Sequence, residues 1–348
     1  MKRRQFLQNA ALGFTAVSLP ELPRIFAETR MGVVVHSYAI RGNPKVESSK
    51  YPGFQNALDL MEHCHQIGAG GVQVVVKDWS ADFAEKVRDR REKLGMYLEG
   101  SIGLPKTTAD VATFEKEVKN AKEAGAHILR TVTLGGRRYE VFRTADAFRE
   151  FKKNAVTSLQ LAEPVLKKHR VKLAVENHKD MLAPELAEVL KQIGSEWVGA
   201  TLDFGNNIAL LEDPMEVVQA LMPYLVSTHI KDMAVEEYDA GFLLSEVPLG
   251  KGMLDLPKMI TLCKQHNPNM TFNLEMITRD PLEIPCLNEA YWATFSDRPG
   301  SDLARTLQMV RKNKPRAALP RVAKLSLEEK LAAEEANIVQ SFEYWKQR

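Results

Sequence analysis

Short apolar runs rich in Val and Ile alternate with longer stretches of helical spacing over most of this chain. Eight such runs follow residue 30, at 32–40, 71–76, 96–102, 127–134, 171–177, 198–204, 225–230 and 270–277. Runs of this kind, bounded by Gly or polar turns, are typical of buried parallel strands. Eight strands that alternate with helices predict an α/β protein, and specifically a (β/α)8 or TIM barrel.

The stretches between these runs carry the sequence signals of helix ends. Three of them finish at a glycine where a C-terminal cap is expected, namely Gly68, Gly125 and Gly194. Another begins with Asp213 as its N-cap and Pro214 at the first helical position. An open doubly wound sheet is the alternative fold, but it requires a GxGxxG fingerprint after the first strand, and none is present there.

The N-terminus resembles an export signal rather than part of the fold. Arg3 and Arg4 precede an apolar run at 10–19, which is far shorter than the roughly 20 residues that a membrane-spanning helix needs. The Arg-Arg-x-Phe-Leu pattern is similar to the twin-arginine signal, which exports folded proteins. We therefore predict a signal peptide at 1–28, a periplasmic location and no membrane insertion after its removal. The alternative is an amphipathic first helix of a cytosolic protein.

The mature chain is predicted to form one barrel followed by a helical tail. We assign 29–313 to the barrel and 314–348 to a C-terminal helical extension that packs on the barrel or on a neighbouring subunit. The formal net charge of +2 gives no electrostatic case for nucleic acid or an anionic membrane as a partner. The three cysteines show no CxxC spacing, so isolated buried thiols are expected rather than disulfides or a thiolate zinc site.

One acid or imidazole stands at the end of each of the last four predicted strands: Glu176, Asp203, His229 and Glu275. The active site of such a barrel lies at the carboxyl ends of its strands, so these four side chains can converge on one point. Three carboxylates and one imidazole, with no sulfur, suit a divalent ion. The carboxylate majority favours hard ions, so Mn²⁺ is the expected metal, with Mg²⁺, Co²⁺ and Zn²⁺ as alternatives.

Five short motifs carry a family resemblance: VENH (175–178), LDFGN (202–206), HIKD (229–232), GKG (250–252) and NLE (273–275). Through them the chain resembles the sugar phosphate isomerase/epimerase family over most of its length. These are the xylose isomerase-like barrels, which include ketose 3-epimerases. The resemblance implies that the four strand-end residues are metal ligands. It also implies that Glu176 and Glu275 face each other across the substrate as an acid/base pair.

Such a site suits proton transfer at a carbon beside a carbonyl. One carboxylate removes the proton, the metal stabilises the enediolate, and the other carboxylate returns a proton. We therefore expect an isomerase or epimerase that acts through a metal-bound enediolate. The predicted periplasmic location favours an unphosphorylated sugar or keto-sugar as substrate, since phosphorylated sugars are chiefly cytosolic. A leaving group beta to the carbonyl leads to the alternative, a lyase or decarboxylase acting on a 3-keto sugar derivative or 3-keto glycoside.

Two positions depart from the family pattern. Asn206 stands where many relatives have a histidine; it can hydrogen-bond a substrate hydroxyl but does not titrate near neutral pH. Val235 lies where some ketose epimerases carry an arginine. Both departures weaken the case for a simple free-ketose 3-epimerase, and neither affects the metal site.

Six other side chains at or near predicted strand ends are candidates for contact with substrate: His36, Glu99, Arg130, His178, Lys231 and Arg279. Together with Asn206 they would line a pocket for a small sugar. A hydrogen bond within its loop is the alternative role for His178. Ion pairs with nearby acids are the alternative roles for Lys231 and Arg279.

Two other classes of protein fit this pattern less well. A phosphodiesterase related to the barrel endonucleases that repair abasic DNA needs three metals, more histidines at strand ends and a basic DNA face. A non-catalytic sugar-binding barrel is the other alternative, although two opposed carboxylates beside a metal have little use there. The family resemblance implies a homodimer or homotetramer.

Overall fold

The computed structural model describes residues 30–295, 297–315 and 317–348, so the predicted signal peptide at 1–28 lies outside the described residues. Eight parallel strands close into a barrel, with β10 pairing on one side with β1 and on the other with β7. They are β1 (Met31–Val34), β2 (Gly71–Val75), β3 (Tyr97–Ser101), β4 (Ile128–Thr131), β5 (Lys172–Glu176), β6 (Val198–Asp203), β7 (Leu225–Ile230) and β10 (Phe272–Leu274). Each overlaps one of the eight predicted runs, and the predicted (β/α)8 barrel is confirmed.

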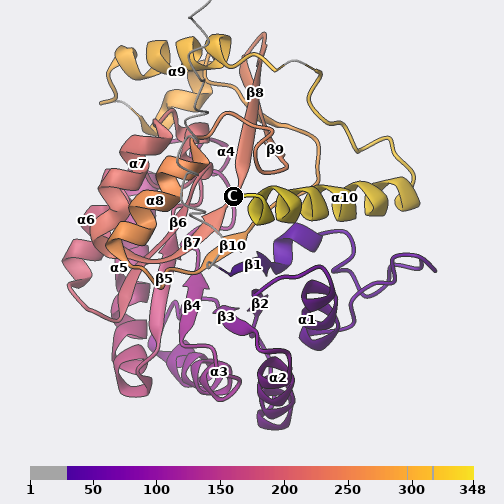
Figure 1. Ribbon diagram of the computed structural model, residues 1–348. Coiled ribbons are helices and arrows are strands. Elements are labelled where there is room, and N and C mark those ends of the chain that lie inside the picture. Colours follow the sequence, from indigo (N-terminus) through magenta and orange to yellow (C-terminus); the bar gives the residue numbers. More distant parts are fainter. Residues whose placement is uncertain (1–29, 296, 316) are drawn as a thin grey trace, which may run out of the picture.

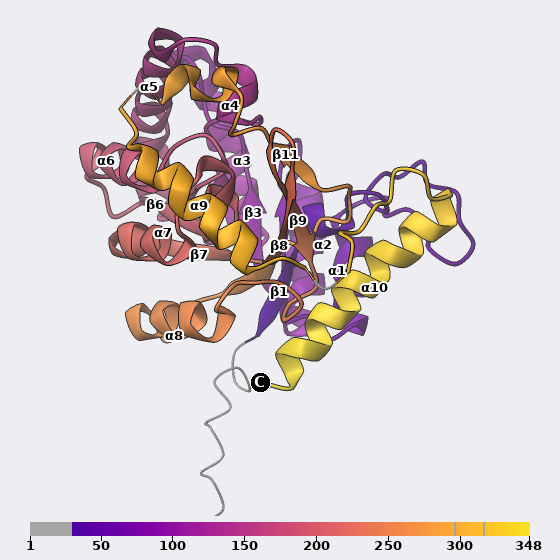
Figure 2. The same ribbon diagram turned by 90° about the horizontal axis from the view of Figure 1, so that it is seen from above.

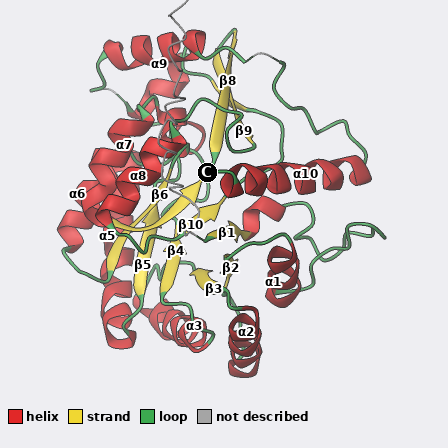
Figure 3. Ribbon diagram, viewed as in Figure 1, coloured by secondary structure: helices red, strands yellow, loops and turns green. Residues whose placement is uncertain are grey.

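Helices lie around the outside of these strands, as Figures 1 and 3 show. They are α1 (Ala57–Gln66), α2 (Ala81–Leu94), α3 (Val111–Glu123), α5 (Ala145–His169), α6 (Ala183–Ile193), α7 (Pro214–Leu221) and α8 (Leu256–His266). The four-residue helix α4 (Arg138–Val141) lies in the connection between β4 and α5. Short 3-10 helices occur at η1 (Val35–Tyr38), η2 (Thr108–Asp110), η3 (Asn206–Leu210), η4 (Met222–Tyr224) and η5 (Glu289–Thr294). The first predicted run, at 32–40, is therefore part strand and part 3-10 helix, because the chain enters η1 directly after β1.

The predicted helix ends are confirmed. Gly68, Gly125 and Gly194 follow α1, α3 and α6 with φ angles of 90°, 91° and 59°, in the left-handed region that closes many helices. The side chain of Asp213 caps α7 by accepting a hydrogen bond of 2.8 Å from the backbone N–H of Met215.

The strands of the barrel are buried on both faces, and most of their side chains are apolar. Buried polar residues also point into the barrel at mid-strand, namely Gln73, Glu99 and Asn273, which are linked by hydrogen bonds. The three cysteines are buried and unpaired, as predicted. Apolar side chains thus fix the strands, and a polar group inside the barrel lies beneath their carboxyl ends.

A three-stranded antiparallel sheet, which the sequence pattern did not predict, stands beside the carboxyl end of the barrel. β8 (Asp232–Tyr238) and β9 (Gly241–Val247) form a hairpin, and β11 (Leu282–Ile284) pairs with β9. Lys231 alone separates β7 from β8, so the hairpin rises from the rim where the predicted ligands lie. The helix α9 (Gly300–Lys312) packs on the other side of this sheet, with which it shares an apolar cluster.

The predicted C-terminal helix is present as α10 (Leu327–Lys346) and packs along the barrel of its own chain, beside α1 in both views (Figures 1 and 2). Near its start, the carboxylate of Glu334 accepts a 3.0 Å hydrogen bond from the backbone N–H of Arg41. Near its end, the ring of Trp345 lies 5.6 Å from that of Phe272 in β10. Among the described residues, no helix combines the length and apolar character that crossing a membrane requires.

Candidate active site

The four predicted ligands meet at the carboxyl end of the barrel. Glu176 and Asp203 are the last residues of β5 and β6, His229 is the second-last residue of β7, and Glu275 follows β10 directly. These strands are consecutive neighbours in the barrel, and Asp203 lies opposite His229 in the β6–β7 register. One ligand atom from each of the four residues lies within 4.8 Å of the other three. His229 Nδ1 is 3.5 Å from Glu176 Oε2 and 3.7 Å from Glu275 Oε1.

The arrangement fits a divalent ion. His229 Nδ1 is a buried atom that makes no hydrogen bond, and it faces Asp203 Oδ2 at 3.9 Å within the group. Buried polar atoms are almost always satisfied, so an unpaired imidazole nitrogen that faces three carboxylates fits the role of a metal ligand. The donor set of three carboxylates and one imidazole matches the preference of Mn²⁺ and Mg²⁺ for oxygen with some nitrogen.

Gln73 on β2 orients the imidazole of His229. Its Oε1 lies 2.8 Å from His229 Nε2, and its Nε2 donates to Glu99 Oε2 at 3.0 Å. Glu99 also accepts hydrogen bonds from Ser227 and Asn273, so its carboxylate is held in place below the four ligands. Because the Gln73 amide donates to Glu99, its oxygen faces His229, and His229 Nε2 must carry the proton. The lone pair of Nδ1 is thereby directed at the metal position.

Replacing Gln73 with Met should therefore weaken metal binding while keeping the side-chain volume. Loss of the partner that orients a histidine ligand typically costs about 10- to 100-fold in affinity, and we expect a fall of that size for Mn²⁺. Calorimetric titration of the metal-free protein measures it, with Gln160→Met on the exposed face of α5 as the matched control. An unchanged Mn²⁺ dissociation constant in a folded Gln73→Met variant would contradict this role.

Two basic side chains pair with the two glutamates. Arg130 Nε donates to Glu176 Oε2 at 2.5 Å, and Lys231 Nζ donates to Glu275 Oε2 at 2.5 Å. Burial alone would raise the pKa of both glutamates, but Arg130 and Lys231 respectively hold these pKa values well below the usual range. Burial raises the pKa of Asp203 instead, although Lys231 Nζ lies 2.7 Å from its Oδ2. Both glutamates are therefore carboxylates at neutral pH.

Metal affinity should depend on pH through His229. Burial would lower the pKa of this imidazole, but the carboxylates of Glu176 and Glu275 outweigh it and raise the pKa to about 9. A metal must displace the proton on Nδ1, so apparent Mn²⁺ affinity should rise about tenfold per pH unit as the pH approaches 9 from below and level off above it.

The same shift affects folding stability in the opposite direction. The pKa of His229 is raised in the fold, so the metal-free protein has this stabilisation in full below about pH 6.5 and loses it as pH rises through 9. Titrations and thermal melts at several pH values, with and without Mn²⁺, check both trends. A pH-independent dissociation constant would show that no proton is displaced from His229.

Asn206 connects the ligand group to the loop after β5. Its Nδ2 donates to Glu176 Oε1 at 2.8 Å, and its Oδ1 accepts hydrogen bonds from Lys179 and, at 3.4 Å, from Lys231. The predicted candidate Asn206 therefore lies beside a ligand, and it holds the second oxygen of the Glu176 carboxylate.

The two candidate histidines lie at the edge of the group. His178 is partly exposed, its Nδ1 is buried without a hydrogen-bond partner, and burial lowers its pKa to about 4. His36 lies on η1, and burial lowers its pKa as well. Both imidazoles are thus neutral at physiological pH and have a nitrogen that can accept a hydrogen bond from a substrate hydroxyl.

The remaining candidates are distributed around the site. Arg279 forms a two-pronged ion pair with Glu246 on β9, which corresponds to the ion-pair alternative, and its side chain is 30% exposed. Glu99 lies one layer deeper in the barrel than the ligands and bonds to Gln73. Arg130 and Lys231 contact the ligands themselves.

The sequence pattern missed four residues of this site, namely Gln73, Asn177, Lys179 and Glu246. Asn177 bridges β5 and β6, donating to the Asp203 carbonyl at 2.9 Å and accepting from its N–H at 2.8 Å. Gln73 had a signal, because a single amide within the apolar run GVQVVV points into the barrel. Glu246 had none, since the hairpin that carries it was itself not predicted.

Comparisons with known proteins agree with this geometry. The model of the family described as xylose isomerase-like TIM barrel matches residues 61–294. The 3-oxo-isoapionate decarboxylase of Pectobacterium atrosepticum is 28% identical over 258 residues, which cover 72% of this chain and 88% of the decarboxylase.

Solved structures show the same fold. The crystal structure of D-psicose 3-epimerase in the presence of D-fructose gives a TM-score of 0.55 at 15% identity, covering 82% of this chain and 97% of that one. The structure of a xylose isomerase-like TIM barrel protein from Mycobacterium smegmatis, in complex with magnesium, gives a TM-score of 0.54 at 15% identity. The match covers 80% of this chain and 98% of that one.

Proposed function

This chain belongs to the xylose isomerase-like TIM barrel family, and on that premise we propose that it is a divalent-metal-dependent sugar isomerase or epimerase. Its substrate is an unphosphorylated sugar or keto-sugar, and Mn²⁺ is the proposed metal. The observation that carries the proposal is the buried group of Glu176, Asp203, His229 and Glu275, whose ligand atoms lie within 4.8 Å of one another. The two glutamates come from β5 and from the end of β10, with β6 and β7 between these two strands in the barrel.

The reaction that suits this group is proton transfer at a carbon beside a carbonyl. When bound, a divalent ion would supply positive charge next to the substrate oxygen that becomes negative as the carbon loses its proton. Glu176 and Glu275 are ionised, so either can accept that proton and, now a carboxylic acid, return it to the neighbouring carbon. For inversion at the same carbon, the opposite glutamate would first take up a proton from solvent and then deliver it. Arg130, Asn206 and Lys231 hold the two carboxylates in fixed orientations through the hydrogen bonds described above.

A decarboxylase or lyase acting on a 3-keto sugar derivative is the second candidate. The observation that favours it is the 28% identity to 3-oxo-isoapionate decarboxylase. In decarboxylation the bond to the carboxylate carbon breaks, its electron pair moves towards the carbonyl oxygen, and a carboxylic acid then protonates the remaining carbon. Both glutamates are ionised, so Glu176 or Glu275 would first take up a proton from solvent and then deliver it to that carbon, and both candidates use the same residues.

Solvent isotope exchange tests the proposal. The metal-loaded protein is incubated in D₂O with ketoses, keto-sugars and sugar acids, and the sugars are followed by NMR. An isomerase or epimerase introduces deuterium at one carbon and keeps the carbon count, whereas a decarboxylase releases CO₂ and deuterates the product. Tight metal binding with neither exchange nor CO₂ release on any of these compounds would favour a sugar-binding barrel and contradict both candidates.

We also propose that the protein is exported by the twin-arginine route, because of Arg3 and Arg4 before the apolar run at 10–19. A double Arg3→Lys, Arg4→Lys variant should stay in the cytoplasm, since this route depends on the arginine pair. Fractionation of cells expressing the full chain measures the location. A double variant that reaches the periplasm as efficiently as the wild type would contradict the proposed route.

A further inference from the structure

Lys179 is a buried cation beside the proposed metal site that the reaction above does not use. Its side chain and backbone together are only 5% exposed. Its φ angle is 92°, in the left-handed region that a residue with a Cβ enters only at a cost in free energy. Its carbonyl oxygen accepts a 2.9 Å hydrogen bond from the backbone N–H of Arg138. The fold therefore holds this lysine in a fixed and unfavourable conformation.

Lys179 also lacks the carboxylate partner that the neighbouring cations have. Three other cations of the site each form an ion pair with a glutamate: Arg130 with Glu176, Lys231 with Glu275, and Arg279 with Glu246. Within the described part of the chain, Lys179 forms no ion pair, and its Nζ donates only to Asn206 Oδ1. Burial and the nearby ammonium of Lys231 lower the pKa of Lys179 to about 8, as expected for an uncompensated buried charge.

With a divalent ion bound and His229 neutral beside it, the charged side chains around the site leave a positive excess. Four acids, Glu176, Asp203, Glu246 and Glu275, are matched by four bases, Arg130, Lys179, Lys231 and Arg279. A divalent ion would leave an excess of two positive charges, or of one if Glu99 in the layer below is included. A buried excess of positive charge is unfavourable unless an anion compensates it, and a neutral sugar brings none.

An anion bound at Lys179 would lie close to the carbons of the substrate that react. Asn206 accepts from Lys179 through Oδ1 and donates to Glu176 through Nδ2, so one amide separates the ammonium from a proposed acid/base group. An anionic group bound at Lys179 would thus place the neighbouring carbons of the same substrate near Glu176. A single ammonium beside an amide suits a carboxylate, whereas phosphate sites usually gather several donors.

We propose that the substrate is a sugar acid, whose carboxylate is bound by Lys179. This inference rests on the proposed function, because it assigns the substrate class of the same site. It makes Lys179 a specificity-determining residue that selects acidic over neutral sugars.

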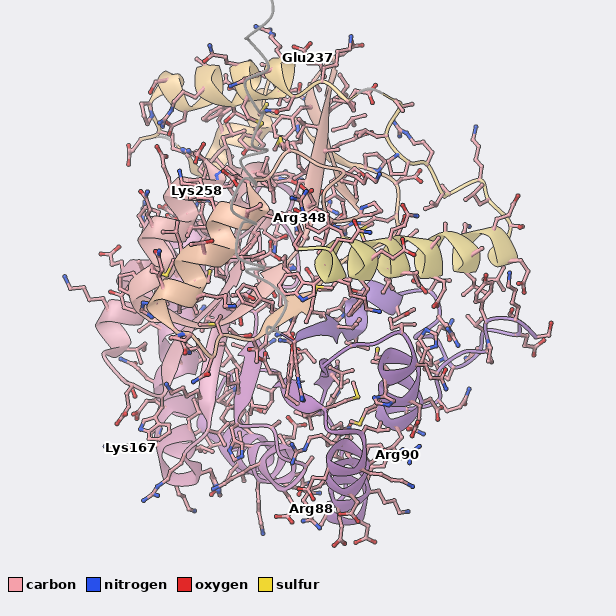
Figure 4. All side chains as sticks on the ribbon, in the orientation of Figure 1. Arg88, Arg90, Lys167, Glu237, Lys258 and Arg348 are labelled. Atoms are coloured by element: carbon pink, nitrogen blue, oxygen red, sulfur yellow. The ribbon has the colours of Figure 1, made fainter. Side chains whose placement is uncertain are left out.

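Binding of a matched pair of probes tests the inference. D-Gluconate and D-glucitol have the same number of carbons, and only gluconate has a carboxylate. Calorimetry with the Mn²⁺-loaded protein should give at least tenfold tighter binding of gluconate, since a hydrogen bond between charged groups is worth about 10- to 100-fold. In Lys179→Met this preference should disappear while glucitol binding changes less than about twofold. Lys258→Met, an exposed lysine on α8 labelled in Figure 4, is the matched control and should retain the preference.

A second variant keeps the inference falsifiable if Lys179→Met folds poorly. Lys179→Arg retains the positive charge at the same backbone position and should retain a preference for gluconate. Equal binding of gluconate and glucitol by the wild type would overturn the inference. A gluconate preference that survives in Lys179→Met would do the same, since the carboxylate would then bind elsewhere, for example at the metal.

The isotope-exchange assay separates this inference from the proposed function. Deuterium exchange into neutral ketoses, at rates equal to those for sugar acids and unaffected by Lys179→Met, would overturn the inference and leave the proposed function standing. Absence of exchange and of CO₂ release with both neutral sugars and sugar acids would overturn the proposed function itself.

Discussion

Glu275→Gln should reduce solvent deuterium exchange into the substrate by roughly 10²- to 10⁴-fold, the usual contribution of a positioned acid/base group. The substitution keeps the shape of the side chain and one oxygen for the metal, but an amide cannot take up a proton at neutral pH. In the wild type this carboxylate is ionised, because Lys231 and His229 outweigh its burial and hold its pKa well below the usual range. The effect should therefore appear in the exchange rate at saturating substrate.

The control for this variant has to separate chemistry from metal loss, because Glu275 is also a proposed ligand. Metal content is measured beside the exchange rate, and assays use saturating Mn²⁺. Glu283→Gln changes an exposed glutamate on β11 and should leave the rate unchanged. Glu176→Gln should resemble Glu275→Gln if both groups transfer protons. A metal-loaded Glu275→Gln variant that exchanges deuterium at the wild-type rate would contradict the assignment.

His229→Ala should lower Mn²⁺ affinity by more than about 100-fold, beyond the 10- to 100-fold range for residues that only orient a ligand. The imidazole is the only nitrogen in the group, and its Nδ1 faces all three carboxylates. Its removal also leaves Glu176, Asp203 and Glu275 to repel one another. Asp203→Ala should lose metal similarly, because its Oδ2 lies 3.9 Å from His229 Nδ1 within the same buried group.

Elemental analysis after dialysis, together with calorimetric titration, measures these losses. His266→Ala, at the exposed end of α8, is the matched histidine control. Circular dichroism of each variant confirms that the barrel has formed. If His229→Ala and Asp203→Ala both keep the wild-type metal content, the metal lies elsewhere and the site is misassigned.

Several parts of this site were predictable from sequence because strand ends in a parallel barrel share one rim. Glu176, Asp203, His229 and Glu275 each end an apolar run, and the closed barrel brings them together. The eight strands were predictable for a similar reason, since buried strands need apolar runs whatever their partners are.

Other parts depend on contacts between segments that are distant in the chain. The antiparallel sheet of β8, β9 and β11 joins a hairpin to a strand that follows β10. No local hydrophobic pattern in the sequence predicts pairing between segments so far apart. Glu246 reaches Arg279 only because this sheet exists. The C-terminal helix was predictable as a helix, but its contacts with Arg41 and Phe272 were not.

The sequence by itself determined the barrel and the chemical identity of the four proposed ligands, because strand periodicity and strand ends are local properties of the chain. Only the tertiary structure decided which nitrogen of His229 faces the proposed metal position, because Gln73 on β2, held by Glu99 on β3, contacts the other nitrogen. It also decided which cations are paired with acids and that Lys179 is not. The net charge of a buried site is the sum over side chains from several strands, so it cannot be predicted from any single segment of the sequence.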